Sequence, residues 1–305
     1  MPSGEFDFIR WVRDRTAADP RVLVGPGDDC AVLTPTRRPT FVTTDVLTDG
    51  VDFRLAEVGG WAVGRKAMAA NVSDIAAMAG SPTAAVVGVV LPNAGNSRQL
   101  AEGLYAGLRE VADAFDFPIV GGDTNTWSDG LVVSVTLLGE ATGRGPVTRG
   151  GAKPGDWVFV TGPCGGSILG RHLSPTPRVR EALALHVTVE LHAMIDVSDG
   201  LAADLSHILE ESRCGAVVLA DAVPVHPDAI TLSQRTGKRP LEHALGDGED
   251  FELVFTVSAS DGERLLRERP VPGLAKIGEC VESGLWLDEG GARRPLAPTG
   301  WVHPV

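Results

Sequence analysis

Six short segments of this chain end an apolar or glycine-punctuated run on aspartate, and this repeated placement of acids most constrains the fold. Carboxylates that a fold gathers together repel one another, so they need cations between them, and Mg²⁺ bridging carboxylate and phosphate oxygens fits best. Glycines beside the acids let backbone amides approach a phosphate closely. One Gly-Asp pair alone indicates only a turn. Together they predict a polyphosphate and metal site, and they are Gly27-Asp28-Asp29, Thr43-Thr44-Asp45, Asn71-Val72-Ser73-Asp74, Gly121-Gly122-Asp123, Asp196-Val197-Ser198-Asp199-Gly200 and Gly246-Asp247-Gly248-Glu249-Asp250.

Charge and hydropathy argue against several classes of protein. The formal net charge of -13 argues against a nucleic-acid or anionic-membrane partner, because either would require a basic patch. No apolar stretch is long enough for a membrane span, and residues 1–15 lack the apolar core of a signal peptide. The 4 cysteines are far apart, so neither a zinc knuckle nor a disulfide framework is indicated. We therefore expect a cytoplasmic protein with reduced thiols.

The length of 305 residues allows two domains and a well-buried core. A glycine-rich, proline-containing stretch at residues 143–155 separates the halves, so we predict domains at 1–145 and 146–305. Short β-type runs recur, with helical patterns between them. The predicted strands are 22–24, 40–44, 84–91, 119–120, 131–138, 157–161, 216–219, 251–257 and 285–287.

Three segments have helical patterns. Apolar residues at three-to-four spacing predict an amphipathic helix over 98–115, with Ser97 as its N-cap. The alanine-rich segment 59–80 is compatible with a tightly packed helix that carries Asn71 and Asp74 on a turn near its middle. A third helix follows Gly200, which makes Ser198 a candidate phosphate contact at a helix start.

Several common signatures are missing. The sequence contains no Walker A motif, no protein-kinase signature and no G-x-S-x-G. Residues 162–167 follow a predicted strand but lack the G-x-G-x-x-G spacing, so we interpret them as a tight strand-to-helix turn rather than a dinucleotide site. His207, near Asp204, is interpreted as a surface histidine on a helix.

Taken in order, the motifs resemble those of the thiamine-monophosphate kinase family, whose superfamily includes aminoimidazole ribonucleotide synthetase and selenophosphate synthetase. The similarity spans nearly the whole chain, and the order of the segments is more specific than any one of them. The segments that carry it are Gly4-Glu5-Phe6, residues 25–31, Thr43-Thr44-Asp45, residues 66–74, Gly121-Gly122-Asp123-Thr124, residues 148–156, residues 196–201 and residues 248–253.

The resemblance implies a fold, an activity and an assembly. The fold is a two-domain α/β (α+β) structure of the aminoimidazole ribonucleotide synthetase type, in which the sheet of the N-terminal α/β domain pairs in a homodimer. The C-terminal domain is α/β and ferredoxin-like. The implied reaction transfers the γ-phosphoryl group of ATP to thiamine monophosphate, giving thiamine diphosphate, with several Mg²⁺ ions in the site.

The resemblance also implies residue roles. No covalent nucleophile is expected, because phosphoryl transfer needs charge neutralisation and alignment, which metals and Arg149 supply. Asp28, Asp247 and Asp250 are interpreted as turn residues or as residues behind the ligands. The family positions that hold Mg²⁺ match Asp29, Thr43, Thr44, Asp45, Asp74, Asp123, Asp196 and Asp199; those that contact ATP match Tyr105, Gly122, Asp123, Arg149 and Ser198; those that contact the thiamine substrate match Asp52, Glu249 and Trp301.

Two departures and three alternatives stay open. The family usually has histidine where this chain has Asp52, and relatives often carry a longer helix before the position of Arg171. Another ATP-using enzyme of the superfamily, of the selenophosphate or aminoimidazole ribonucleotide synthetase type, is one alternative, although residues 1–19 contain no reactive cysteine. A non-catalytic metal-binding relative and a metal-dependent phosphohydrolase are the others.

Overall fold

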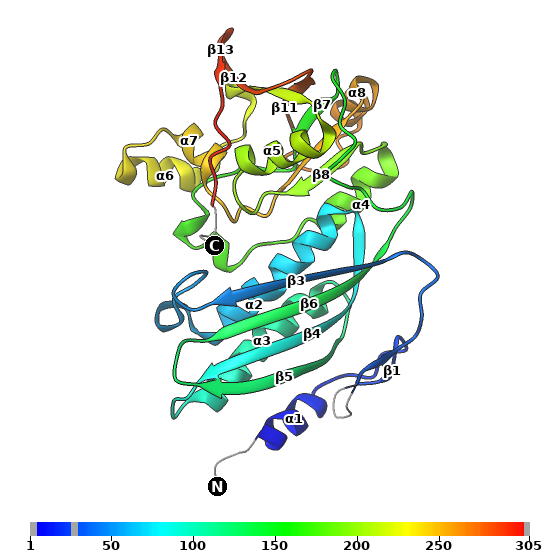
Figure 1. Cartoon of the computed structure of the whole chain (residues 1–305), viewed down its shortest axis with the longest axis vertical. Coiled ribbons are helices and arrows are strands. Elements are labelled where there is room, and N and C mark those ends of the chain that lie inside the picture. Colours follow the sequence, from blue (N-terminus) through cyan, green and yellow to red (C-terminus); the bar gives the residue numbers. More distant parts are fainter. Residues whose placement is uncertain (1–4, 26–29, 302–305) are drawn as a thin grey trace. The chain divides into compact units, whose positions relative to one another are not determined.

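The chain divides into two compact units (Figure 1): unit 1 comprises residues 1–75 and 81–141, and unit 2 comprises residues 76–80 and 142–305. The computed structural model describes residues 5–25 and 30–301. Each unit has its own sheet and helices, so the chain is mixed α/β as predicted. Across the described ranges, we find no helix of the length and apolar character that a membrane span requires.

Unit 1 is built on a four-stranded sheet with the order β3-β6-β4-β5. β3 and β6 pair antiparallel, whereas β4 and β5 are parallel and are joined through a helix. A short antiparallel pair, β1 with β2, precedes this sheet. The strands are β1 (Val22–Val24), β2 (Val32–Leu33), β3 (Thr40–Thr48), β4 (Gly80–Pro92), β5 (Ile119–Trp127) and β6 (Val132–Ala141).

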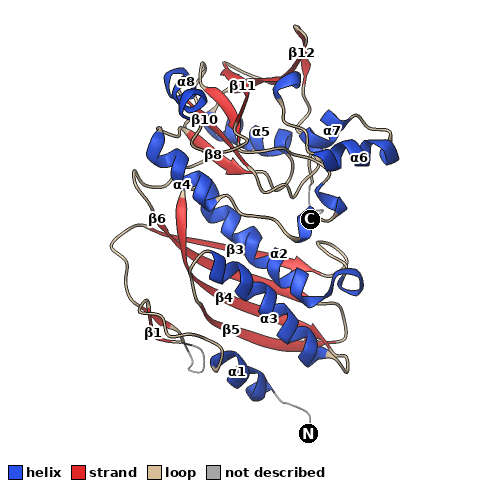
Figure 2. Ribbon diagram, turned by 180° about the vertical axis from the view of Figure 1, so that it is seen from behind, coloured by secondary structure: helices blue, strands red, loops and turns tan. Residues whose placement is uncertain are grey.

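Two long helices, α2 (Leu55–Ala77) and α3 (Ser97–Ala114), cover one face of this sheet (Figure 2). Glycines let them approach closely: a Cβ on Gly64 would lie 2.1 Å from the Leu104 carbonyl oxygen, and one on Gly107 would lie 2.0 Å from that of Trp61. The small residues of the alanine-rich segment therefore serve helix packing. The first helix, α1 (Glu5–Arg13), contacts α3 through an edge-to-face ring pair, Trp11 with Tyr105.

Two local predictions in unit 1 are wrong. Asn71 and Asp74 lie inside helix α2 and not on a turn, and the side-chain amide of Asn71 donates to the Ala67 carbonyl one turn earlier in the same helix. Ser97 is the first residue of α3 and does not cap it; Asn96 precedes the helix, and the Ser97 hydroxyl donates to the Pro92 and Ala94 carbonyls.

Unit 2 contains a seven-stranded sheet with the order β13-β12-β9-β11-β7-β10-β8. Both β10 and β11 run antiparallel to β7, which lies between them, so β10, helix α8 (Ala259–Glu268) and β11 form the split β-α-β unit of ferredoxin-like domains. The strands are β7 (Trp157–Val160), β8 (Ala193–Asp196), β9 (Gly215–Leu219), β10 (Leu253–Val257), β11 (Ala275–Val281), β12 (Leu285–Glu289) and β13 (Ala292–Pro295).

Helices pack on this sheet and close its core. Buried apolar residues of β7, β8 and α5 form one cluster, which includes Val158, Ile195 and Leu205. Burial of such side chains is the main source of stability for the unit. The helices are α4 (Val179–Thr188), α5 (Leu201–Ser212), α6 (Pro227–Thr236), α7 (Pro240–Gly246) and α8 (Ala259–Glu268), with short 3₁₀ turns η1 (Ser167–Leu169), η2 (Arg171–Leu173) and η3 (Ala220–Ala222).

Candidate functional site

Unit 1 gathers three of the predicted metal ligands. Along β3 the buried Phe41 and Leu47 alternate with exposed residues, and Thr43 and Asp45 share their face of the strand. The Thr43 hydroxyl donates to the Asp74 carboxylate on α2 at 2.5 Å. Burial, and then the charges of Asp74 and Asp52, raise the pKa of Asp45 to about 7. Strand and helix thus bring Thr43, Asp45 and Asp74 into one acidic group.

The donors of this group fit a hard divalent cation. They are carboxylate and hydroxyl oxygens, which Mg²⁺ prefers. The pKa of Asp45 is raised partly by neighbouring carboxylates, and a bound cation would reverse that repulsion. The group formed by Thr43, Asp45 and Asp74 can therefore hold Mg²⁺.

Asp52 lies in the turn between β3 and α2, close enough for its charge to raise the pKa of Asp45. Its carboxylate accepts the Thr48 amide at 2.7 Å, and its carbonyl accepts the Lys66 ammonium at 2.6 Å. Lys66 is only 2% exposed. Sequence reasoning gave Lys66 no role, although a lysine inside an alanine-rich apolar helix is a signal of a buried polar contact.

Thr44 faces away from this group. Its hydroxyl donates to the Val135 carbonyl and pairs with the Thr136 hydroxyl on β6. Side chains alternate across a strand, so Thr44 and its neighbours Thr43 and Asp45 point to opposite faces. The Thr44 side chain is therefore apart from the acidic group, and only its backbone could take part there.

A cavity of about 1210 Å³ in unit 1 brings together three predicted ATP contacts, Tyr105, Gly122 and Asp123. Typical ligand pockets enclose roughly 300–1,000 Å³, so a nucleotide fits. The buried Tyr105 hydroxyl lies beside the Arg109 guanidinium but makes no hydrogen bond of good geometry with the described residues. Gly122 also has a packing role, because a Cβ there would lie 2.2 Å from the Val87 carbonyl oxygen.

In unit 2, Ser198 and Asp199 form the turn that leads into α5, with Gly200 as N-cap, as predicted for a helix start. Asp204, in the first turn of α5, accepts the Asp199 and Gly200 amides, each at 3.0 Å. Burial raises the pKa of Asp204 to about 7, opposed by these amides. Sequence reasoning missed that Asp204 fixes this turn; an acid in the first turn of a helix was the available signal.

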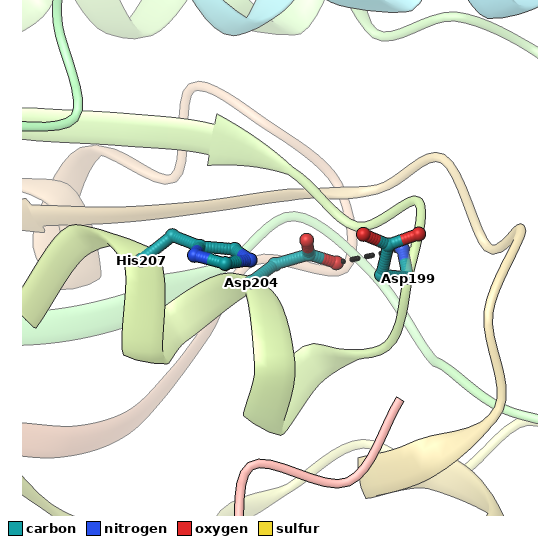
Figure 3. A group of neighbouring side chains, drawn as sticks. All are labelled: Asp199, Asp204 and His207. Atoms are coloured by element: carbon teal, nitrogen blue, oxygen red, sulfur yellow. Dashed lines mark hydrogen bonds between the residues drawn. The ribbon is translucent and has the colours of Figure 1, made fainter. Parts of the chain in front are cut away.

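Asp199, Asp204 and His207 lie together on this turn and helix (Figure 3), with one ligand atom of each within 4.8 Å of the others. His207 is partly buried on α5, so the description as a surface histidine is only partly right. One Asp204 oxygen is occupied by two amides. Asp199 therefore has more capacity than Asp204 to bind a metal ion.

Two of the three predicted thiamine contacts, Glu249 and Trp301, flank the same turn. The Glu249 amide donates to the Ser198 carbonyl at 2.7 Å, and the Trp301 amide donates to the Asp199 carbonyl at 3.0 Å. Trp301 is 55% exposed, so its ring is accessible for stacking. Unit 2 thus brings Ser198, Asp199, Glu249 and Trp301 together, while Asp196 is buried at the end of β8 just before the turn.

The glycine turn at residues 162–167 binds carboxylates of its own chain. The Gly165 amide donates to Asp250 at 2.7 Å, and the Gly166 amide donates to Asp247 at 2.8 Å. These amides are the groups that a nucleotide-binding loop would turn toward phosphate. Their use here agrees with the interpretation of Asp247 and Asp250 as turn residues.

Besides Thr44, two predicted residues are not brought into these groups. Arg149 is exposed, and its carbonyl accepts the hydroxyl of Ser212, the last residue of α5. Ser198 precedes the first residue of this 12-residue helix, and a helix of that length rises about 18 Å. Arg149 and Ser198 therefore lie at opposite ends of α5. Asp29, like Asp28, lies outside the described residues.

Comparison with known proteins gives full-length matches. Residues 27–141 match the model of the AIR synthase related protein, N-terminal domain, and residues 153–285 match that of the C-terminal domain. A thiamine-monophosphate kinase of Rhodopirellula baltica is 41% identical over 98% of this chain and 97% of its own length.

Solved structures match both in fold and in sequence. The crystal structure of thiamine-monophosphate kinase from Stenotrophomonas maltophilia K279a superposes with a TM-score of 0.81 at 34% identity, covering 95% of this chain and 98% of that one. A structure described as "AaThiL complexed with AMPPCP and TMP" superposes with a TM-score of 0.76 at 29% identity, covering 98% of this chain and 96% of that one.

Proposed function

The chain belongs to the thiamine-monophosphate kinase family, and we propose that it transfers the γ-phosphoryl group of ATP to the phosphate of thiamine monophosphate. An acceptor phosphate oxygen forms the new bond to the γ-phosphorus, the bond from that phosphorus to the bridging oxygen breaks, and ADP leaves. The products are thiamine diphosphate and ADP. The acidic group of Thr43, Asp45 and Asp74 carries the proposal, because its oxygen donors suit Mg²⁺. The activity is supported by a relative that matches this chain over nearly its full length and is such a kinase.

In this proposal the metal ions are held in two places. Thr43, Asp45 and Asp74 hold Mg²⁺ in unit 1, and Asp196 and Asp199 hold it in unit 2. Asp29, Thr44 and Asp123 stay predicted ligands. When bound, Mg²⁺ neutralises the charge that two polyanionic substrates bring together.

The nucleotide is bound by residues that line the cavity of unit 1. Tyr105 has a buried hydroxyl to offer, and Gly122 and Asp123 lie at the same cavity. Ser198, just before α5, stays a predicted ATP contact, while Asp204 accepts the Asp199 and Gly200 amides beside it. Arg149 stays a predicted ATP contact that would place its charge on the phosphates.

The acceptor is bound by groups that suit thiamine. The Glu249 carboxylate pairs with its cationic or amino parts, and the exposed Trp301 ring stacks on one of its rings. Asp52, beside the acidic group of unit 1, stays a predicted contact of thiamine monophosphate. No side-chain nucleophile is needed, because the acceptor phosphate is already ionised near neutral pH.

We further propose a cytoplasmic homodimer, in which residues 1–145 bind ATP and metal and pair through their sheet. The face of β3 that the helices do not cover exposes Val42 at 68% and Val46 at 58%. Exposed apolar side chains on one sheet face favour a protein partner. Light scattering on the purified protein should give twice the chain mass, and a monomer would contradict the dimer.

Product analysis tests the reaction. Purified protein with ATP, Mg²⁺ and thiamine monophosphate should yield thiamine diphosphate and ADP in equal amounts, separated by chromatography. ADP with free phosphate instead would assign a phosphohydrolase. No turnover of ATP with thiamine monophosphate, under conditions where a relative is active, would refute the kinase.

A further inference from the structure

The loop that carries Glu249 has an unusual backbone. Glu249 and Phe251 have φ angles of 60° and 52°. Residues with a side chain rarely adopt these left-handed values, so neighbouring contacts must hold the loop in place. Asp250 lies between the two and is the first place to look for such a contact.

Asp250 is anchored by both of its oxygens. Its side chain is 0% exposed. One carboxylate oxygen accepts the Gly165 amide at 2.7 Å, and the other accepts the Arg171 guanidinium at 2.9 Å. The same guanidinium donates to the Gly165 carbonyl at 2.8 Å, so Arg171, Asp250 and Gly165 form a closed ring of hydrogen bonds. A charged, buried ring of this kind fixes geometry well.

The neighbouring residues extend this attachment. The Gly166 amide donates to Asp247 at 2.8 Å, and the Ser167 hydroxyl donates to the Gly248 carbonyl at 2.6 Å. Gly165 has to be glycine, because its φ is 94° and a Cβ there would lie 2.7 Å from the Ala244 nitrogen. Three successive residues, 165–167, thus hold one side of the loop at 247–250.

The other side of the loop is held at the Ser198 turn. The Glu249 amide donates to the Ser198 carbonyl at 2.7 Å, and the Phe251 amide donates to the Val197 carbonyl at 2.8 Å. A Cβ on Gly248 would lie 2.6 Å from the Ser198 carbonyl, so the two segments are in close contact. Glu249 is therefore placed by the Ser198 turn on one side and by the Asp250 ring on the other.

We propose that Arg171 is a positioning residue for the acceptor: through Asp250 and Gly165 it holds the backbone that presents Glu249 to the cationic part of the substrate. Arg171 itself contacts no substrate. Asp228, whose carboxylate lies 3.5 Å from the Arg171 Nε atom, supports the guanidinium from α6. This inference rests on the proposed function, because the proposed function supplies the substrate that Glu249 binds.

The test compares how an Arg171 variant changes the KM values for the two substrates. Arg171→Met should raise the KM for thiamine monophosphate about 10-fold to 100-fold, the range that displacing a binding group by a fraction of its length produces. The KM for ATP should change less than about twofold, because the altered loop carries the acceptor contact. Arg180→Met, at an exposed position of α4, is the matched control and should behave as wild type.

A double variant shows whether Arg171 acts through Glu249. In the Glu249→Gln background, Arg171→Met should add less than about a twofold change in the same KM, because both changes remove one contact. Arg171→Lys keeps the charge but only part of the ring of hydrogen bonds, so its KM for thiamine monophosphate should lie between those of wild type and Arg171→Met. It replaces Arg171→Met in the test if that variant does not fold.

Specific results would overturn the inference. Equal rises in both KM values, or full additivity with Glu249→Gln, would mean that Arg171 only stabilises the fold. If wild type makes no thiamine diphosphate, the proposed function fails. Hydrogen exchange at residues 247–251 then still tests the ring: faster exchange in Arg171→Lys than in Arg180→Met supports it, and equal exchange refutes it.

Discussion

One carboxylate group in each unit shows a different electrostatic environment. In unit 1, the pKa of Asp45 is raised by burial and by the charges of Asp74 and Asp52. In unit 2, Asp250 and Glu252 meet the guanidinium groups of Arg171 and Arg178. The first group repels itself and is suited to receive a cation. The second is bound by guanidinium groups of the chain itself and is suited to hold the fold.

This difference gives a physical criterion for interpreting acidic motifs. An Asp in a glycine-rich segment can be a ligand or a turn residue, and the sequence around it is alike in both cases. Asp247 binds the Gly166 amide and His243, whereas Asp45 has neighbouring carboxylates. Removing an acid should therefore affect catalysis at Asp45 or Asp74 and stability at Asp250 or Glu252.

The largest effect is expected for Asp74→Asn. Losing one charge from the group with Thr43 and Asp45 should lower kcat by at least about 10²-fold, because metal charge stabilisation is worth several kcal/mol. Steady-state kinetics at saturating Mg²⁺ measure it. Asp113→Asn, on the exposed surface of α3, is the control. Near-wild-type turnover of Asp74→Asn would mean that the site is assigned wrongly.

A smaller effect, on stability, is expected for Arg178→Met. Arg178 donates to both oxygens of Glu252, which is 4% exposed, so the change leaves a buried charge without its partner. The free energy of unfolding should fall by about 3 kcal/mol in urea denaturation. Adding Glu252→Gln should restore part of that loss. An unchanged urea midpoint, or no recovery in the double variant, would show that the pair is not structural.

The smallest effect concerns the pH dependence of stability. Burial raises the pKa of Asp250 from 3.8 to about 7, although the Gly165 amide and Arg171 oppose it. Between these values the folded state holds a proton that the unfolded state has released, so stability falls as the pH rises. Asp250→Asn should remove up to about 1.4 kcal/mol per pH unit of this slope. Parallel curves of stability against pH for variant and wild type would contradict the assignment. Asp45 and Asp204, whose pKa values are also raised to about 7, contribute equally to the slopes of both proteins.

Local patterns predicted much of this molecule. The three-to-four spacing of apolar residues indicated α3, and the helix start after Gly200 is where the motif placed it. Four strands were not predicted: β2 has only two residues, β8 and β13 have four each, and β11 contains a glycine. That glycine, Gly278, is explained by a contact that sequence cannot show, because a Cβ there would lie 2.2 Å from the Val217 carbonyl oxygen.

The site was harder to predict where partners are distant in the chain. Thr43 and Asp74 are each in a recognisable motif, so their meeting could be expected. Arg171 and Asp250 are 79 residues apart, and no periodicity links them. Arg149 and Ser198 were assigned to one ligand, yet α5 separates them. Motifs thus gave a set of candidate residues, while tertiary packing decides which of them meet.

Anomalous scattering from crystals grown with Mn²⁺ in place of Mg²⁺ tests directly whether metal binds the acidic group of unit 1 and not Asp250 or Glu252. We expect peaks within coordination distance of the carboxylates of Asp45 and Asp74, and none beside Asp250 or Glu252, whose oxygens already accept hydrogen bonds. Peaks beside Asp250 or Glu252, or an absence of metal at Asp45 and Asp74 with both substrates bound, would contradict the account.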